Sequence, residues 1–321
     1  MIKYIKAFRK YLRNMKYLVR EEVLFKEHSN LMTSKRIDNL KKYVWNESEK
    51  GLKVLVVSKF FTRNFGDRLG FHNITLLLSS LKNIAYIDYD DLEDLLKDPA
   101  EYDLVIVGTG NSLYHKMIND NFYQYLLRAN KLIGIFGFQY YEKLLEKEQL
   151  FIQCINLFDK VFLRYNQDFE FLIKTYSRNK IEIKTNITHL GDWLILLFPN
   201  TLWFKDDKLD IIPKEPFIRN AMDLYIQDIQ MYRIVHSSRL HTLLCAFCSA
   251  EKVSYEEQYE KENNYKSGKF RGLFLDVFEK NFEEKKLFYI DRKSVNIYRE
   301  KVSDNFDELK NYLKVLLSDK K

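Results

Sequence analysis

Basic and polar side chains gather in one short segment, Ile234-Val-His-Ser-Ser-Arg-Leu-His-Thr-Leu-Leu-Cys-Ala246, which lies between two apolar runs. Arg239, His236 and His241 are costly to bury there without partners, because each side chain would lose its hydration. An arginine can hold a carboxylate or phosphate, and an imidazole exchanges protons near neutral pH. The segment predicts an active-site strand, turn and helix that bind an anionic small molecule. His236 is the more structural of the two histidines, and Ser237 or Ser238 can cap the helix.

A second polar cluster, Asn64-Phe-Gly-Asp-Arg68, follows the apolar run Lys53–Ser58. Gly66 permits a tight turn with close approach of the backbone, while Asn64 and Asp67 carry polar atoms toward the crevice. The alternative is an ordinary loop with an N-cap for the next helix, a position where aspartate is common. Both interpretations remain open from the sequence.

Two more clusters follow later strands. In Gly108-Thr-Gly-Asn-Ser112, Gly110 and Asn111 belong to a turn whose backbone N–H groups can face an anion at a helix start, although a lone Gly-x-Gly is also typical of a simple turn. Arg164, with Asp168 nearby, can hold a carboxylate or phosphate bidentately. A structural ion pair between these two side chains is the alternative.

The elements that must position these residues alternate between strand and helix from Gly51 onward. We predict strands at 53–58, 85–89, 103–108, 131–136, 160–164, 209–212 and 232–235, and helices at 69–82, 91–97, 122–129, 141–158, 217–231 and 306–317. This alternation favours an α/β fold with Rossmann-like parallel sheets, in which ligands bind at the carboxyl ends of the strands. All four clusters fall at predicted strand ends.

The chain of 321 residues is long for one hydrophobic core, so more than one domain is expected. The rhythm loosens after Gly191-Asp192, where Pro199, Pro213 and Pro216 follow, and we place a boundary there. We expect a basic helical segment at 1–50, an α/β domain at 51–192 and a smaller α/β domain at 193–321 that carries Arg239 and His241.

The N-terminal segment holds twelve Lys and Arg against four Asp and Glu between Met1 and Trp45. Ile5, Phe8, Leu12, Met15 and Val19 share one helical face. Such a helix packs on the body of the protein or lies on anionic lipid. The formal charge of +7 suits anionic substrates or a membrane surface, and we find no nucleic-acid motif.

Three cysteines, Cys154, Cys245 and Cys248, make an odd number that favours a reducing compartment, so a cytoplasmic location is expected. Cys245 and Cys248 have the spacing of half a metal site, but they lie in an apolar stretch without a second ligand pair, which favours core packing. No apolar run approaches the ~20 residues that span a bilayer.

Taken together, the motifs resemble those of the polysaccharide pyruvyl transferase family. The resemblance covers about residues 52 to 275 and includes Asn-x-Gly-Asp, the Gly-x-Gly turn, Gly134 to Gly137, Leu190-Gly-Asp192 and Ser-x-Arg-Leu-His. It implies transfer of a pyruvyl group from phosphoenolpyruvate to a sugar of a capsule or lipopolysaccharide, as a cyclic ketal. It also implies a two-domain, glycosyltransferase-B-like arrangement, in which the short stretch from 192 to 232 indicates a reduced C-terminal half.

The resemblance assigns roles to the clustered residues. Arg239 and His241 would meet phosphoenolpyruvate, His241 as general acid toward the methylene carbon, while Asp67 would be the base. Asn64, Gly66, Gly110, Asn111, Arg164 and Ser238 would line the substrate site. No metal and no cofactor beyond the donor are expected, and the acceptor would be a glycan or lipid-linked saccharide at the inner membrane face. The alternatives are a glycosyltransferase that uses a sugar nucleotide and a non-catalytic glycan-assembly protein.

Overall fold

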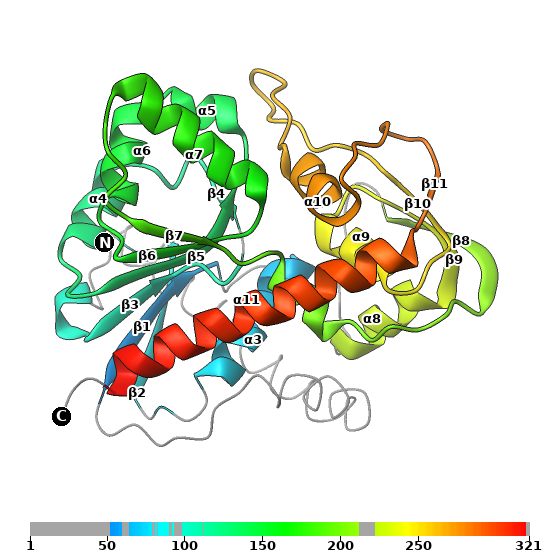
Figure 1. Ribbon diagram of the computed structural model, residues 1–321, viewed down its shortest axis with the longest axis horizontal. Helices are drawn as coiled ribbons and strands as arrows, with labels where there is room; N and C mark the ends of the chain where they lie inside the picture. The colour runs from blue at the N-terminus through cyan, green and yellow to red at the C-terminus, as the bar shows by residue number, and fades with distance from the viewer. Residues whose placement is uncertain are drawn as a thin grey trace, which may run out of the picture.

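The computed structural model describes residues 52–59, 64–78, 81, 83–89, 92, 98–110, 112–211 and 222–318. Within these ranges the chain forms two lobes, each built on a sheet (Figure 1). The first lobe comprises the described residues from 52 to 198, and the second comprises those from 205 to 289. Outside the described residues lie the predicted N-terminal segment 1–50, the helix at 91–97 except Leu92, and the first part of the helix at 217–231.

The first lobe is an α/β unit with a parallel, Rossmann-like sheet, as the alternating pattern predicts. Its strands pair in the order β2-β1-β3-β5-β6-β7, and the short β4 pairs with β5. They are β1 (Lys53–Ser58), β2 (Asn83–Asp88), β3 (Leu104–Val107), β4 (Ser112–Leu113), β5 (Leu132–Phe138), β6 (Lys160–Leu163) and β7 (Asn186–His189). The order reverses between β1 and β3, which makes this a topological switch point where ligands bind in such sheets.

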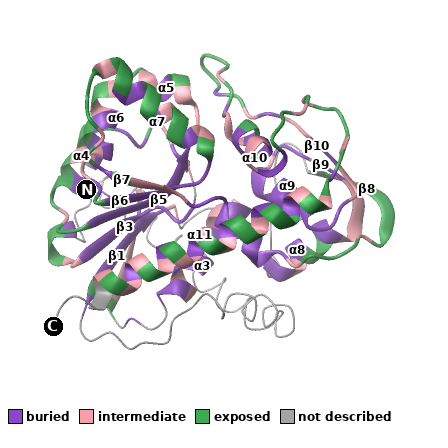
Figure 2. Ribbon diagram, viewed as in Figure 1, coloured by how far each residue is buried: buried purple, intermediate pink, exposed green. Residues whose placement is uncertain are grey.

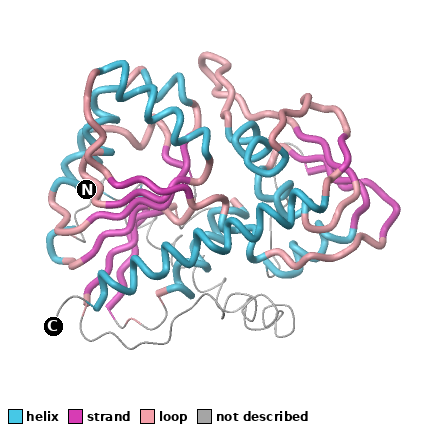
Figure 3. Tube along the Cα trace, viewed as in Figure 1, coloured by secondary structure: helices cyan, strands magenta, loops and turns pink. Residues whose placement is uncertain are grey.

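Helices cover both faces of this sheet (Figure 3). Alternate strand residues point to opposite faces, so Val54 and Val56 join one core while Leu55 and Val57 join the other. The second of these cores includes residues of α4 (Asp120–Leu127), α6 (Glu148–Ile155) and α7 (Asn166–Asn179). The first core includes α3 (Phe65–Leu77) and continues into the second lobe. Burial on both sides explains the unbroken apolar runs of the strands (Figure 2).

The predicted helix at 141–158 is wrong as one element. The chain forms α5 (Tyr141–Leu145) and then α6, with a break at Lys147, whose φ of −121° and ψ of 32° are not helical. The Lys147 ammonium donates to the carbonyl groups of His115 and Ile118, at 3.1 and 2.8 Å. These contacts hold the break against the loop after β4. Helix α7 and strand β7 were not predicted, because their exposed faces weaken the apolar pattern.

The second lobe contains a smaller sheet in the order β11-β10-β9-β8. Strands β8, β9 and β10 are parallel, and β11 is antiparallel to β10. The elements in chain order are the 3₁₀ helix η3 (Trp193–Leu197), which joins the lobes, then β8 (Lys205–Ile211), α8 (Met222–Met231), β9 (Tyr232–Ser237), α9 (Leu240–Phe247), β10 (Lys252–Tyr255), α10 (Lys269–Phe278) and β11 (Phe288–Tyr289).

A long helix, α11 (Arg292–Ser318), extends from the second lobe back along the first (Figure 1). Arg292 donates to the carbonyl of Phe247 at 3.1 Å in the second lobe, and Glu308 lies 3.3 Å from the ammonium of Lys160 in the first. The sequence predicted only 306–317 as helix, so the element begins earlier than expected. Helix α11 therefore contacts both lobes.

No helix within the described residues combines the length and the apolar character that crossing a bilayer requires.

Candidate active site

The two most specific sequence motifs meet at a single contact. Gly66 lies in the first turn of α3, after β1, and His241 lies in the first turn of α9, after β9. A Cβ built on Gly66 would fall 1.6 Å from Nδ1 of His241, so only a glycine leaves room for the imidazole. The carboxyl ends of strands from both sheets thus converge on one point.

Asp192, just after β7, faces the other side of the His241 ring. The Nε2 atom of His241 lies 3.4 Å from Oδ2 of Asp192, which is ion-pair distance. Burial opposes ionisation of Asp192 most strongly, but His241, Arg164 and Tyr165 together outweigh it and lower the pKa of this carboxyl. The fully buried Asp192 is therefore an anion in the interior.

Arg164 lies at the end of β6, as predicted, and is almost completely buried. Its guanidinium donates to the carbonyl of Gly110 at 3.0 Å and to the hydroxyl of Ser112 at 2.6 Å. It also lies over the Tyr165 ring, 4.7 Å from the centroid. Arg164 thereby fixes the turn after β3 and places a cation close to Asp192.

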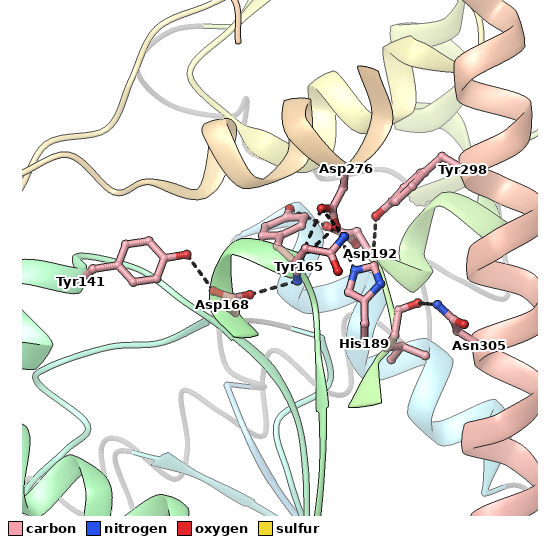
Figure 4. Close-up of polar contacts among 10 residues, drawn as sticks. Tyr141, Tyr165, Asp168, His189, Asp192, Asp276, Tyr298 and Asn305 are labelled. Atoms are coloured by element: carbon pink, nitrogen blue, oxygen red, sulfur yellow. Dashed lines mark hydrogen bonds and ion pairs between the residues drawn. The ribbon is translucent and has the colours of Figure 1, made fainter. Parts of the chain in front are cut away.

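Asp168 does not form the direct ion pair with Arg164 that was one of the two sequence interpretations. Its carboxylate accepts hydrogen bonds from the backbone N–H of Phe138 at 2.9 Å, the hydroxyl of Tyr141 at 2.8 Å and the backbone N–H of Tyr165 at 3.1 Å (Figure 4). Burial raises the pKa of Asp168 to about 6, against the opposing effect of Arg164 and these hydrogen bonds. Asp168 thus organises the junction of β5, β6 and α7.

Arg239 occupies the N-cap position of α9, directly before Leu240. Neither serine caps the helix in the predicted way: the Ser237 hydroxyl accepts from the backbone N–H of Arg239 at 2.9 Å. The Ser238 carbonyl accepts from the side-chain amide of Gln258 at 2.6 Å. His236 contacts the Ser254 hydroxyl on the neighbouring strand β10, which agrees with a structural role for that histidine.

Lys269, at the start of α10, is a site residue that sequence reasoning missed. Burial lowers the pKa of this ammonium to about 8, and the cations Arg164 and Arg239 lower it further, while Glu257 opposes them. Its ammonium contacts the side-chain carbonyl of Gln258, which joins Lys269 to the Ser238 segment. The only local signal was Gly268, which has a φ of 77° and begins the helix. Lys269 lies in the lysine- and glutamate-rich tail, where nothing else distinguished it.

Several buried polar atoms around these residues have no hydrogen-bond partner among the described residues. They include Nε of Arg164, Oδ1 of Asp192, Oγ of Ser238 and Nε2 of His241. A buried donor or acceptor without a partner costs about 1–3 kcal/mol, so four such atoms in one region need an explanation. A polar ligand that exchanges hydrogen bonds with them would provide it.

The remaining predicted residues have more local roles. The Asn64 side chain caps α3 by accepting from the backbone N–H of Asp67 at 3.2 Å. The expected helix cap is therefore present in this cluster, but an asparagine provides it and not an aspartate. Asp67 lies in the same first turn, beside Gly66.

The Gly108–Ser112 turn leads into strand β4, where a helix start was expected. The backbone N–H groups of Gly108 and Gly110 donate to the carbonyls of Val57 and Ile135, at 2.7 and 2.9 Å. These two donors are thus used within the sheet. Gly110 contributes instead through its carbonyl, which Arg164 binds, while Asn111 lies outside the described residues.

With this geometry in hand, we compared the chain with known proteins. No protein-family model and no curated protein matches it.

The residues that the structure describes contain no group of three or more His, Cys, Asp and Glu side chains arranged to hold a metal ion. Cys245 and Cys248 are completely buried, and burial raises the pKa of both thiols. The two cysteines thus pack in the core, as their apolar surroundings predicted.

Proposed function

We propose that the protein is a pyruvyl transferase, which moves the pyruvyl group of phosphoenolpyruvate onto a sugar of a cell-surface glycan. One observation carries the proposal. A buried imidazole, His241, lies beside an ionised carboxylate in a region that also receives cations from β6, the start of α9 and α10. This set of groups suits a small dianion that must be protonated on carbon.

Phosphoenolpyruvate carries a carboxylate and a phosphate, and the three cations Arg164, Arg239 and Lys269 match these two groups. Arginine binds either group in a planar, bidentate manner, and lysine acts as a point charge. Arg164 is buried, and Arg239 and Lys269 are half-buried, so their attraction to an anion exceeds that of fully exposed residues. The proposed donor thus supplies the negative charge that the site lacks.

The proposed reaction has two steps. In the first, a sugar hydroxyl attacks C2 of phosphoenolpyruvate, His241 donates a proton to C3, and a base accepts the hydroxyl proton. Asp67 is our candidate base, since it lies next to Gly66, which His241 contacts. In the second, a neighbouring hydroxyl displaces the phosphate from C2 and loses its proton, which gives the cyclic ketal and inorganic phosphate.

The assay follows from this stoichiometry. The protein is incubated with phosphoenolpyruvate and a panel of lipid-linked and free saccharides, and phosphate release is measured together with the mass of the acceptor. We expect phosphate and a pyruvyl-ketal product in equal amounts. Folded protein that releases no phosphate with any acceptor would contradict the proposal.

A glycosyltransferase is the second candidate. Two α/β lobes whose strand ends converge on one site, linked by a helix that contacts both, support a glycosyltransferase-B-like arrangement. A sugar nucleotide would then bind at the second lobe. A thermal-shift screen separates the two, because a ligand stabilises the protein by binding the folded state. Stabilisation by sugar nucleotides but not by phosphoenolpyruvate would favour the glycosyltransferase.

A non-catalytic role in glycan assembly is the third candidate. It predicts that Arg239→Ala and His241→Ala leave biological function intact, whereas either enzyme would lose activity. We further propose that the protein works in the cytoplasm at the inner membrane face, on a lipid-linked or nascent saccharide. A lipid-vesicle sedimentation assay of the full chain tests that location.

A further inference from the structure

We propose that Asp192 is the positioning residue for His241, holding the imidazolium in place for proton transfer to the donor. This inference rests on the proposed function and extends it to a residue for which that function has not yet accounted. The sequence marked Leu190-Gly-Asp192 only as a motif. The structure gives its carboxylate a specific neighbour, the His241 ring.

Three elements fix Asp192 in place. The Tyr165 hydroxyl, at the start of α7, donates to Oδ2 of Asp192 at 3.2 Å. The backbone N–H of Asp192 donates to the Tyr298 hydroxyl on α11 at 2.7 Å (Figure 4). Gly191 has a φ of 86° and packs against Val302, which sets the direction of the chain just before Asp192. A carboxylate held in this way can orient the ring that it faces.

The His241 ring is held from two sides, but its Nε2 atom makes no hydrogen bond. Gly66 lies against Nδ1, and Asp192 lies 3.4 Å from Nε2, a separation at which no hydrogen bond forms in this structure. Catalytic hydrogen bonds are often long before substrate binds and tighten afterwards. The other carboxylate oxygen, Oδ1, also has no partner among the described residues. Asp192 therefore retains the capacity to strengthen its contact with the ring.

Charge supports the same role. The neutral form of a fully buried carboxyl is normally favoured, yet the cationic form of His241 is the largest influence that keeps Asp192 ionised. The charged groups near this site in the described part of the chain also include Asp67, Arg164, Arg239 and Lys269, contributed by α3, β6, the N-cap of α9 and α10. The hydroxyls of Tyr165 and Tyr298, from α7 and α11, contact Asp192 directly. The three cations are matched to the donor in the proposed function. Asp192 is the anion that lies against the imidazole.

The test compares the wild type with Asp192→Asn. Asparagine keeps the shape and can accept from Tyr165, but it has no charge. We expect kcat to fall about 100-fold, a size common when a catalytic group loses its orienting partner. The KM for phosphoenolpyruvate should change less than about threefold, and the alkaline limb of the kcat profile should move to lower pH. An unmoved limb would overturn the assignment.

Asp276→Asn is the matched control. Asp276 is also a buried carboxylate at the lobe interface, and it lies 2.9 Å from Nε2 of His189 (Figure 4). Losing that pair should lower thermal stability but leave the pH profile unchanged. Equal shifts of the profile in both variants would mean that Asp192 has only a structural role.

Two further experiments test the role of Asp192 if the asparagine variant does not fold or if the protein does not use phosphoenolpyruvate. If Asp192→Asn does not fold, Tyr165→Phe removes one hydrogen bond that fixes the carboxylate but leaves its charge in place, so kcat should fall without any move of the alkaline limb to lower pH. In an NMR titration without any substrate, the His241 ring should lose its proton at a lower pH in Asp192→Asn than in the wild type. Because this titration needs no phosphoenolpyruvate, it distinguishes failure of the inference from failure of the proposed function.

Discussion

The imidazole of His241 occupies the space that a side chain at residue 66 would need: a Cβ on Gly66 would lie 1.6 Å from Nδ1 of His241. The glycine belongs to the first lobe and the histidine to the second. Their contact joins the Asn-x-Gly-Asp motif to the Arg-Leu-His motif across the interface. The position of the histidine therefore depends on the docking of α3 against α9.

Gly66→Ala should reduce pyruvyl transfer at least 100-fold, because the added methyl group displaces the His241 ring. Overpacking of this kind typically costs about 1–3 kcal/mol of stability. A double-mutant cycle provides the control. In a His241→Ala background the methyl group has room, and alanine stabilises a helix by about 0.5–1 kcal/mol relative to glycine. Equal destabilisation in both backgrounds, measured by urea unfolding, would contradict the contact.

Asp168→Asn should change how stability depends on pH. The pKa of Asp168 is raised to about 6 by burial, so the folded state favours the protonated form. Its contribution to the free energy of unfolding is full below about pH 4 and is lost as the pH rises through 6, a loss of about 3 kcal/mol. Asparagine does not titrate. Between pH 4 and 7.5 the free energy of unfolding of the variant should therefore rise by that amount relative to that of the wild type. If the free energies of unfolding of variant and wild type differ by the same amount at every pH, the raised pKa of Asp168 is contradicted.

The affinity for phosphoenolpyruvate should decline as the pH rises above 8. The pKa of Lys269 is lowered to about 8, so the ammonium loses its charge in that range and attracts the donor less. Lys269→Arg should remove the decline, because a guanidinium stays charged, and Lys269→Met should weaken binding about tenfold at pH 7. Calorimetric titration measures all three. An identical pH dependence in the wild type and in Lys269→Arg would exclude this lysine from the donor site.

Arg164→Lys should weaken donor binding about tenfold and destabilise the fold by about 1–3 kcal/mol. A lysine cannot reproduce the two hydrogen bonds to Gly110 and Ser112 that the planar guanidinium makes. Ser112→Ala is the matched control, since it removes one of these contacts and keeps the charge. It should lower stability by about 1 kcal/mol and leave the affinity within twofold. Equal losses of affinity in both variants would show that Arg164 acts only through the turn.

Cys245→Ala and Cys248→Ala should fold and retain activity. Both thiols are buried in the apolar core, and truncation of such a small side chain costs about 1–2 kcal/mol. Treatment with a chelator should leave the melting temperature unchanged. A large loss of stability on chelation would revive the interpretation of these cysteines as metal ligands.

The alternation of strands and helices was predictable because the first sheet is buried on both faces. Val54, Leu55, Val56 and Val57 are all completely buried, so they form an apolar run that no exposed residue interrupts. Strand β7 and helix α7 escaped prediction because each exposes one face, and the break at Lys147 depends on a contact with the distant loop at His115. Tertiary contacts of this kind leave no local pattern.

The site was predictable to a similar extent. Arg239, His241 and Gly66 lie in compact motifs, so their types and spacing marked them. Lys269 is one lysine among many in its segment, and only the folding of α10 against the lobe interface separates it from the others. Asp192 was visible as part of a motif. Its partner His241 lies much later in the chain, after β8, α8 and β9, so the sequence did not connect the two.

The most direct test of the proposal is a crystal structure of the protein soaked with phosphoenolpyruvate. We predict that the carboxylate and phosphate lie among Arg164, Arg239 and Lys269, with the methylene carbon facing His241 and the His241–Asp192 separation shortened to a hydrogen bond. Phosphoenolpyruvate that does not bind, together with a sugar nucleotide that occupies the second lobe, would contradict the account.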